Sequence, residues 1–263
     1  MCIESVISNK AISPLACKRF ADAIKPDHMQ AMQAMVYSYH PNTAIHHNGT
    51  GLLAAELTAH FSQELDDNEA IEVIQAAYTH DFGKLAMSQA ILDTSEIFTD
   101  DEKQRMKEHP ERGYHKVVEI TKNPEAAIPI LMHHSLQPDS YPDNETTERI
   151  LLEHNMSPKV LEDKKIWLKN IIVIAADQGE ARYPSKHSTH PYGKRDYPVE
   201  ELEQKISTDL SSAKLIEHLQ MTKHLEYSLK VIGQIAIKSS KIMSAHDNKS
   251  PFLIRLQEDR FTK

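Results

Sequence analysis

The sequence predicts an all-helical protein, and three observations lead to this fold class. Apolar residues recur at helical spacing along much of the 263-residue chain, and no convincing strand pattern is present. Glycine occurs only 7 times, which disfavours folds that depend on many glycine turns. Capping residues followed by proline or glutamate precede several apolar stretches and mark helix starts. We therefore expect a helical bundle with a helical lead before it and a helical extension after it.

Two helices are expected in the first, proline-free part of the bundle. The stretch 52–61 carries apolar residues on one face of a helix. The next helix opens at Asp67, a good capping residue with glutamates in the first turns. It is expected to end near Gly83, because glycine tolerates the backbone conformation that terminates a helix.

Three later helix starts follow from caps and prolines. Residues 99–102 form a capping box for a short charged helix that ends at 109–110, and Pro110 can itself begin the following helix. An Asn-Pro pair opens a helix over 123–134. A Ser-Pro pair opens a long helix over 157–177.

Composition divides the chain into three parts. Residues 1–45 form the N-terminal helical lead, residues 46–198 the bundle, and residues 199–263 the C-terminal helical extension. Two segments rich in proline, serine and aspartate, 135–144 and 183–198, are expected to be loops. The terminal helices could form a homodimer interface or simply pack on the bundle.

Charge and hydropathy exclude several classes of function. The net charge is −8 and the basic residues are scattered, so no extended nucleic acid is expected as a partner. The apolar run 171–176 is far shorter than the ~20 residues that span a bilayer, so no membrane partner is expected either. The N-terminus lacks a secretory pattern and the 2 cysteines lack CxxC spacing, which favours a cytoplasmic protein. No GxxxxGK or GxGxxG motif indicates a nucleotide-binding loop.

The chain carries 16 histidines, and metal binding is the commonest reason for such an excess. Helix ends can converge in a bundle, where carboxylates and imidazoles suit a pair of first-row divalent ions. Asp81 is suited to bridge two ions because a carboxylate has two oxygens. The candidates that lie at predicted helix ends are His80, Asp81, His109, His133, His134 and Asp177.

Two segments carry a resemblance to a known family. HDFGKLAMSQAIL, which starts at His80, and FTDDEKQRMKEHPERG, which starts at Phe98, precede a histidine doublet. With that doublet they resemble the HD-domain metal-dependent phosphohydrolases and, within them, the HD-GYP subgroup. The resemblance covers roughly 47–195 and implies an HD-domain bundle that hydrolyses a cyclic dinucleotide such as cyclic di-GMP with two divalent ions, iron or manganese.

The resemblance also implies a ligand set. One ion would be held by His80, Asp81, Asp177 and a histidine from an earlier helix, and the other by Asp81, His109, His133 and His134. The earlier histidine is expected to be His47, which leads directly into the apolar stretch, with His46 as the alternative.

Two departures from the family pattern are informative. Ser140-Tyr141-Pro142 replaces the GYP of the subgroup, and serine lacks the backbone freedom of glycine, so the grip of the loop on a substrate can differ. Family members with a third metal have a glutamate where this chain has Thr43, so we expect two ions.

The chemistry also follows from the residues themselves. Two divalent ions about 3.5–4 Å apart can activate a bridging water and clamp a phosphodiester. Lys84, close after Asp81, would stabilise charge on the phosphate of a small nucleotide substrate. Weaker candidates for substrate contacts are Tyr141, Arg182, Lys194 and Arg195.

Three alternatives stay open at this point. The chain could hydrolyse another nucleotide or phosphoester. It could be an oxygenase, because an aspartate-bridged, histidine-rich site also suits a pair of iron ions. It could also be a non-catalytic nucleotide-binding signalling module that keeps the metal site as a receptor.

Overall fold

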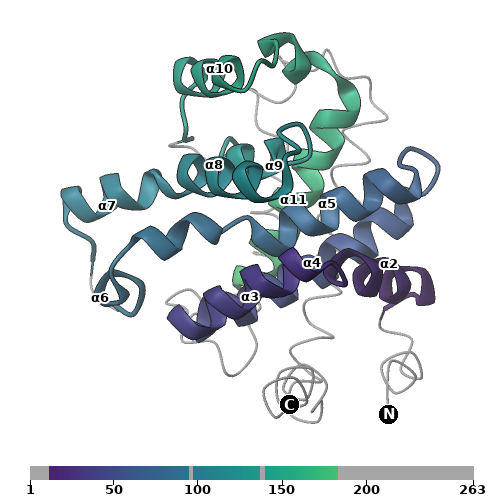
Figure 1. Ribbon diagram of the computed structural model, residues 1–263, viewed down its shortest axis with the longest axis horizontal. Helices are drawn as coiled ribbons and strands as arrows, with labels where there is room; N and C mark the ends of the chain where they lie inside the picture. Colours follow the sequence, from purple (N-terminus) through teal and green to yellow (C-terminus); the bar gives the residue numbers. More distant parts are fainter. Residues whose placement is uncertain (1–11, 95–96, 137–139, 183–263) are drawn as a thin grey trace.

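The computed structural model describes residues 12–94, 97–136 and 140–182, and every regular element in these ranges is a helix (Figure 1). The predicted all-α class is therefore confirmed. The predicted extension 199–263 and the loop 183–198 lie outside the described residues. None of the described helices is both long enough and apolar enough to cross a bilayer.

The first three described helices are α2 (Pro14–Ile24), α3 (Asp27–Tyr39) and α4 (Pro41–His60). A proline in the first turn begins α2 and α4, where its missing N–H costs no hydrogen bond. His40 caps α4, because its side chain accepts a hydrogen bond from the backbone N–H of Thr43. The helix predicted over 52–61 thus begins eleven residues earlier, inside the predicted lead.

Helix α5 (Asp67–Thr79) begins with a capping box between Asp66 and Glu69, close to the predicted start. The predicted end near Gly83 is wrong, because α5 ends at Thr79 and Gly83 lies in the 3₁₀ helix η1 (Phe82–Ala86). No glycine in the described residues has a positive φ. A Cβ at Gly83 would lie 2.0 Å from the carbonyl oxygen of His109, so glycine is needed there for close packing.

The middle of the chain contains α6 (Gln89–Leu92), α7 (Asp100–Lys107) and α8 (His109–Thr121). The predicted capping box of Thr99 and Glu102 starts α7 and is confirmed. Pro110 lies in the first turn of α8, as predicted. This arrangement places His109 at the N-terminal end of α8.

The last described elements are α9 (Ile128–Met132), α10 (Asn144–Glu153), η2 (Pro158–Glu162) and α11 (Lys164–Arg182). The helix predicted to start at 123–124 starts later, at Ile128. The single long helix predicted from 157–158 is two elements, because a 3₁₀ turn ends before α11 begins.

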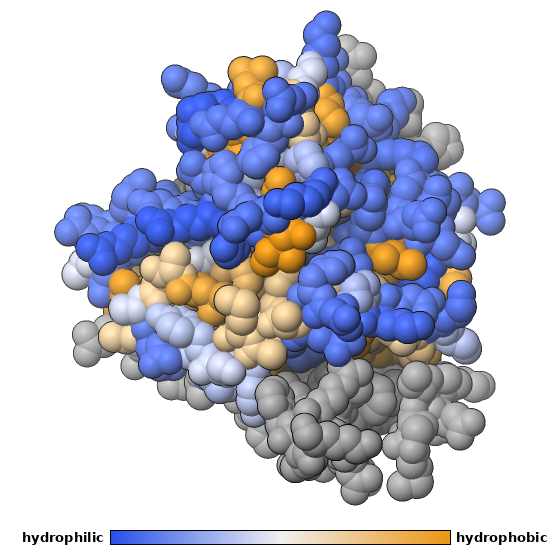
Figure 2. Space-filling view, viewed as in Figure 1, coloured by the Kyte–Doolittle hydropathy of each residue, from blue (hydrophilic) through white to orange (hydrophobic). Residues whose placement is uncertain are grey.

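Helix α4 is the centre of the bundle and packs on α2, α3, α5 and α11. Helix α11 also packs on α5 and α9, and residues 171–176 of α11 are completely buried. Helix α8 lies against η1 and α9, while α10 lies at the top of Figure 1. Figure 2 shows a largely hydrophilic face, with apolar side chains gathered over α3, where Met35 is exposed.

Candidate metal centre

The candidate site forms where ends of α5, α8 and α9 meet the middle of α4 and the last turns of α11. His80 is the C-cap residue of α5, His109 begins α8, and His133 is the C-cap residue of α9. His46 lies within α4 and Asp177 within α11. The side chains of His80, His109 and His133 are almost completely buried, and those of His46 and Asp177 are 7% and 11% exposed. The core of the bundle therefore shields the site from water.

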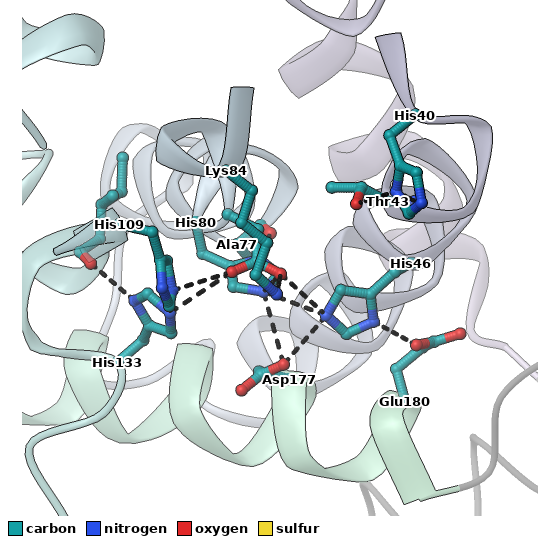
Figure 3. A network of polar contacts seen from close by, with 12 residues as sticks. His40, Thr43, His46, Ala77, His80, Lys84, His109, His133, Asp177 and Glu180 are labelled. Atoms are coloured by element: carbon teal, nitrogen blue, oxygen red, sulfur yellow. Dashed lines mark hydrogen bonds and ion pairs between the residues drawn. The ribbon is translucent and has the colours of Figure 1, made fainter. Parts of the chain in front are cut away.

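One half of the site consists of His46, His80 and Asp177, whose ligand atoms lie within 4.8 Å of one another. The Nε2 atom of His46 is 3.0 Å from Oδ1 of Asp177 and 3.1 Å from Nε2 of His80. The same Asp177 oxygen lies 3.4 Å from Nε2 of His80. Figure 3 shows the three side chains pointing toward one another. Three ligand atoms therefore converge on one point.

The other half consists of His109, His133 and His134, which also place one ligand atom each within 4.8 Å. The Nε2 atoms of His109 and His133 are 3.0 Å apart. The predicted histidine doublet and the histidine at the start of α8 are thus brought together, as their positions at helix ends suggested.

Asp81 lies between the two halves and presents one oxygen to each. Its Oδ2 is 3.4 Å from Nε2 of His80 and 3.7 Å from Nε2 of His46. Its Oδ1 is 3.0 Å from Nε2 of His109 and 3.7 Å from Nε2 of His133. The Asp81 side chain is 2% exposed, so water does not satisfy these oxygens. This is the arrangement expected of a bridging carboxylate.

Three of the histidines have the same ring orientation, which the backbone fixes. Nδ1 of His80 donates to the carbonyl of Ala77 at 2.8 Å, and Nδ1 of His109 donates to the carbonyl of Met106 at 2.6 Å. Nδ1 of His133 donates to the carbonyl of Ile130 at 2.6 Å. The Nδ1 hydrogen bond leaves Nε2 of each ring facing the site, where its lone pair can bind a metal when the ring is neutral.

The donor set fits divalent metal ions. With Nδ1 protonated, the facing Nε2 atoms of neutral His109 and His133 are both acceptors, so no hydrogen bond joins them. Nitrogen ligands about 2.0–2.1 Å from one ion lie about 3 Å apart, which matches the observed contact. Within the described part of the chain, the buried Oδ1 of Asp81 has no hydrogen-bond partner. A cation between these atoms would satisfy all three.

The two halves differ in charge. Burial lowers the pKa of His46, but the charges of Glu180 and Asp177 outweigh it and raise the pKa to about 10. His80 likewise has its pKa raised to about 9, because Asp81 and Asp177 outweigh burial. Burial lowers the pKa of His109 to about 4 and also lowers the pKa values of His133 and His134.

This difference predicts how metal binding responds to pH. Near pH 7 the metal-free rings of His46 and His80 carry protons that an ion must displace, whereas His109 is already neutral. Affinity at the His46 half should therefore rise between pH 6 and 8, by about tenfold per pH unit for each proton released, and stay nearly constant at the other half. Calorimetric titration with Mn²⁺ in buffers of different ionisation enthalpy measures the protons released. Equal pH dependence at both halves would contradict the prediction.

The structure brings His46, rather than the favoured His47, into the cluster. His47 is completely buried, and both of its ring nitrogens lack a hydrogen-bond partner among the described residues. Its ring centre lies 5.4 Å from that of His80, while among the described residues its ligand atoms belong to none of the groups that could hold a metal. Neighbouring residues of a helix point about 100° apart, so only one of the two rings can face Asp177.

Of the residues predicted to contact the substrate, Lys84 and Tyr141 lie beside the site, and the other three side chains are not described. Nζ of Lys84 lies 2.5 Å from Oδ2 of Asp81, at the edge of the site. The ring of Tyr141 stacks on His134, with ring centres 4.5 Å apart. Arg182 ends α11 and its side chain lies outside the described residues, as do Lys194 and Arg195.

Sequence reasoning missed Glu180, which contacts His46 from α11. Glu180 follows Asp177 by three residues, so both lie on the same face of one helix. A second carboxylate one turn after a predicted ligand, within an apolar helix, is the signal that could have identified it.

A family model described as HD domain matches residues 43–181, more than half of the chain. No curated protein and no solved structure matches. The matched range contains both halves of the site and Asp81 between them.

Proposed function

The chain belongs to the HD-domain family, whose members are generally metal-dependent phosphohydrolases, and from this we propose that it is a cytoplasmic phosphodiesterase with two divalent ions. We further propose an HD-GYP-like enzyme whose substrate is a cyclic dinucleotide such as cyclic di-GMP. The position of Asp81, with one oxygen toward each histidine group, is the observation that supports two ions.

The residues of the site would bind the two ions as two groups of ligands that share Asp81. His46, His80 and Asp177 would hold one ion, His109, His133 and His134 the other, and Asp81 both. Imidazole and carboxylate ligands suit iron or manganese. Two bound ions supply an activated water and a clamp for the phosphodiester. The buried walls of the site keep bulk water from weakening these charges.

Substrate contacts are proposed at the edges of the site. Lys84 would place its ammonium group on the phosphate. Tyr141 is beside the second histidine group and would contact a base. Arg182 would reach the substrate from the end of α11. A homodimer through the terminal helices also stays a proposal.

Replacing Lys84 by alanine should separate catalysis from metal binding. Lys84 is not a ligand, and its side chain is 18% exposed at the edge of the site, so both ions should stay bound. The rate constant of hydrolysis should fall by about 10²–10³-fold, as when one group that stabilises transition-state charge is lost. Metal analysis and single-turnover kinetics measure the two effects. If Lys84→Ala lost as much metal as Asp81→Ala, Lys84 would not act by stabilising transition-state charge alone, and the prediction would be wrong.

The function is tested by anaerobic turnover of cyclic and linear dinucleotides by the iron-loaded or manganese-loaded protein. His80→Ala is the control, because it removes a ligand and should abolish product formation. Product that requires His80 and no oxygen supports the phosphodiesterase and identifies the substrate. Oxygen-dependent turnover would instead indicate an iron oxygenase, and tight binding without product a signalling module.

A further inference from the structure

His46 differs from the other ring-oriented histidines in the partner of its second nitrogen. His80, His109 and His133 lie at helix ends and donate from Nδ1 to a backbone carbonyl three residues earlier. His46 lies inside α4, and its Nδ1 meets a side chain of another element, Glu180. A side chain, rather than a backbone carbonyl at a helix end, is thus the partner seen for Nδ1 of this ring.

Glu180 of α11 supplies that partner. Its Oε2 accepts a hydrogen bond from Nδ1 of His46, and Figure 3 shows this contact on the side of the ring opposite Asp177. Asp177, one turn earlier on α11, meets Nε2 of the same ring at 3.0 Å. The ring of His46 is thus clamped between two carboxylates of one helix.

The burial of Glu180 requires an explanation. Its side chain is 6% exposed, and a buried carboxylate is costly unless it is paired. Its Oε2 pairs with Nδ1 of His46, so both the cost of burying this carboxylate and its position depend on that ring.

Gly49 makes room for this contact. It lies three residues after His46 on α4, on the same face of the helix. A Cβ at this position would lie 2.6 Å from Cγ of Glu180, closer than van der Waals contact permits. Glycine inside a helix is unfavourable relative to alanine, so its presence here is explained by the passage of the Glu180 side chain.

We propose that Glu180 is a positioning residue that holds the ring of His46 with Nε2 toward the metal and thereby sets the affinity of the His46 half for its ion. The inference rests on the proposed metal centre. A carboxylate on the second nitrogen fixes the tautomer and increases the basicity of a ligating imidazole, and removing such a partner commonly costs 10–100-fold in metal affinity.

The test is titration of the full chain with Mn²⁺, which measures a separate affinity for each of the two ions. Glu180→Ala should weaken one ion by about 10–100-fold and leave the other within about twofold. Glu180→Gln keeps an acceptor oxygen but loses the charge, so its effect should be smaller. Glu119→Gln is the control, because Glu119 is an exposed glutamate that pairs with Lys116 on α8, outside the site.

Gly49→Ala provides a second variant in which His46 and Glu180 are both intact. The added methyl group should displace Glu180 and weaken the same ion as Glu180→Ala does, with the melting temperature recorded for every variant. Unchanged affinities in Glu180→Ala, or equal weakening of both ions together with a lower melting temperature, would overturn the proposal. If the wild-type chain binds no ion, the proposed function itself fails, so the two failures can be distinguished.

Discussion

Asp81→Ala is expected to abolish binding of both ions. Asp81 contributes Oδ2 to the half that contains His80 and Oδ1 to the half that contains His109. Removing it leaves only histidines on one side, leaves His46, His80 and Asp177 on the other, and removes the carboxylate between them. The loss of affinity should therefore exceed the roughly 10–100-fold effect of losing an outer partner of a ligand.

Metal analysis after dialysis, together with the rate of phosphodiester hydrolysis, measures this effect. Both should fall to background, because the ions are expected to carry the activated water. Asp22→Ala is the matched control, since Asp22 forms a surface ion pair with Lys18 and lies outside the site. Retention of one tightly bound ion in Asp81→Ala would show that the carboxylate is not a shared ligand.

Local sequence signals predicted much of the fold and of the site. Capping boxes and prolines set the starts of α5, α7 and α8 because these signals act within one turn. The predicted ends of helices were less accurate. The predicted helix end at Gly83 is wrong because this glycine serves the packing of η1 on α8, a contact that is distant in sequence.

The contrast between local signals and contacts distant in sequence also explains which site residues could not be predicted from the sequence. His80 and Asp81 are adjacent, and His109 and His133 lie at helix ends, so local signals identify them as candidates. The choice between His46 and His47 depends on which face of α4 meets α11, and that packing is not encoded in either residue alone. The contact with Glu180 spans 134 residues of sequence and is decided by the same packing.

Exchanging each of these two histidines for alanine should therefore give opposite results. His46→Ala removes a nitrogen 3.0 Å from Asp177 and leaves Glu180 without its partner, so one ion should be lost. His47→Ala removes a ring that, within the described ranges, contributes to neither half of the site, so both ions should stay bound. His47→Ala also opens a cavity in the core, and a lower melting temperature is expected from that alone.

His47→Leu separates that packing effect from metal binding. Leucine has a similar volume and carries no polar atoms, whereas both nitrogens of His47 are buried without a hydrogen-bond partner in the described residues. Replacing such a group by an apolar side chain should cost little stability or even raise it. The decisive measurement is metal content together with melting temperature for the three variants. Loss of an ion in both His47 variants, with retention in His46→Ala, would make His47 the ligand and require the face of α4 to turn when metal binds.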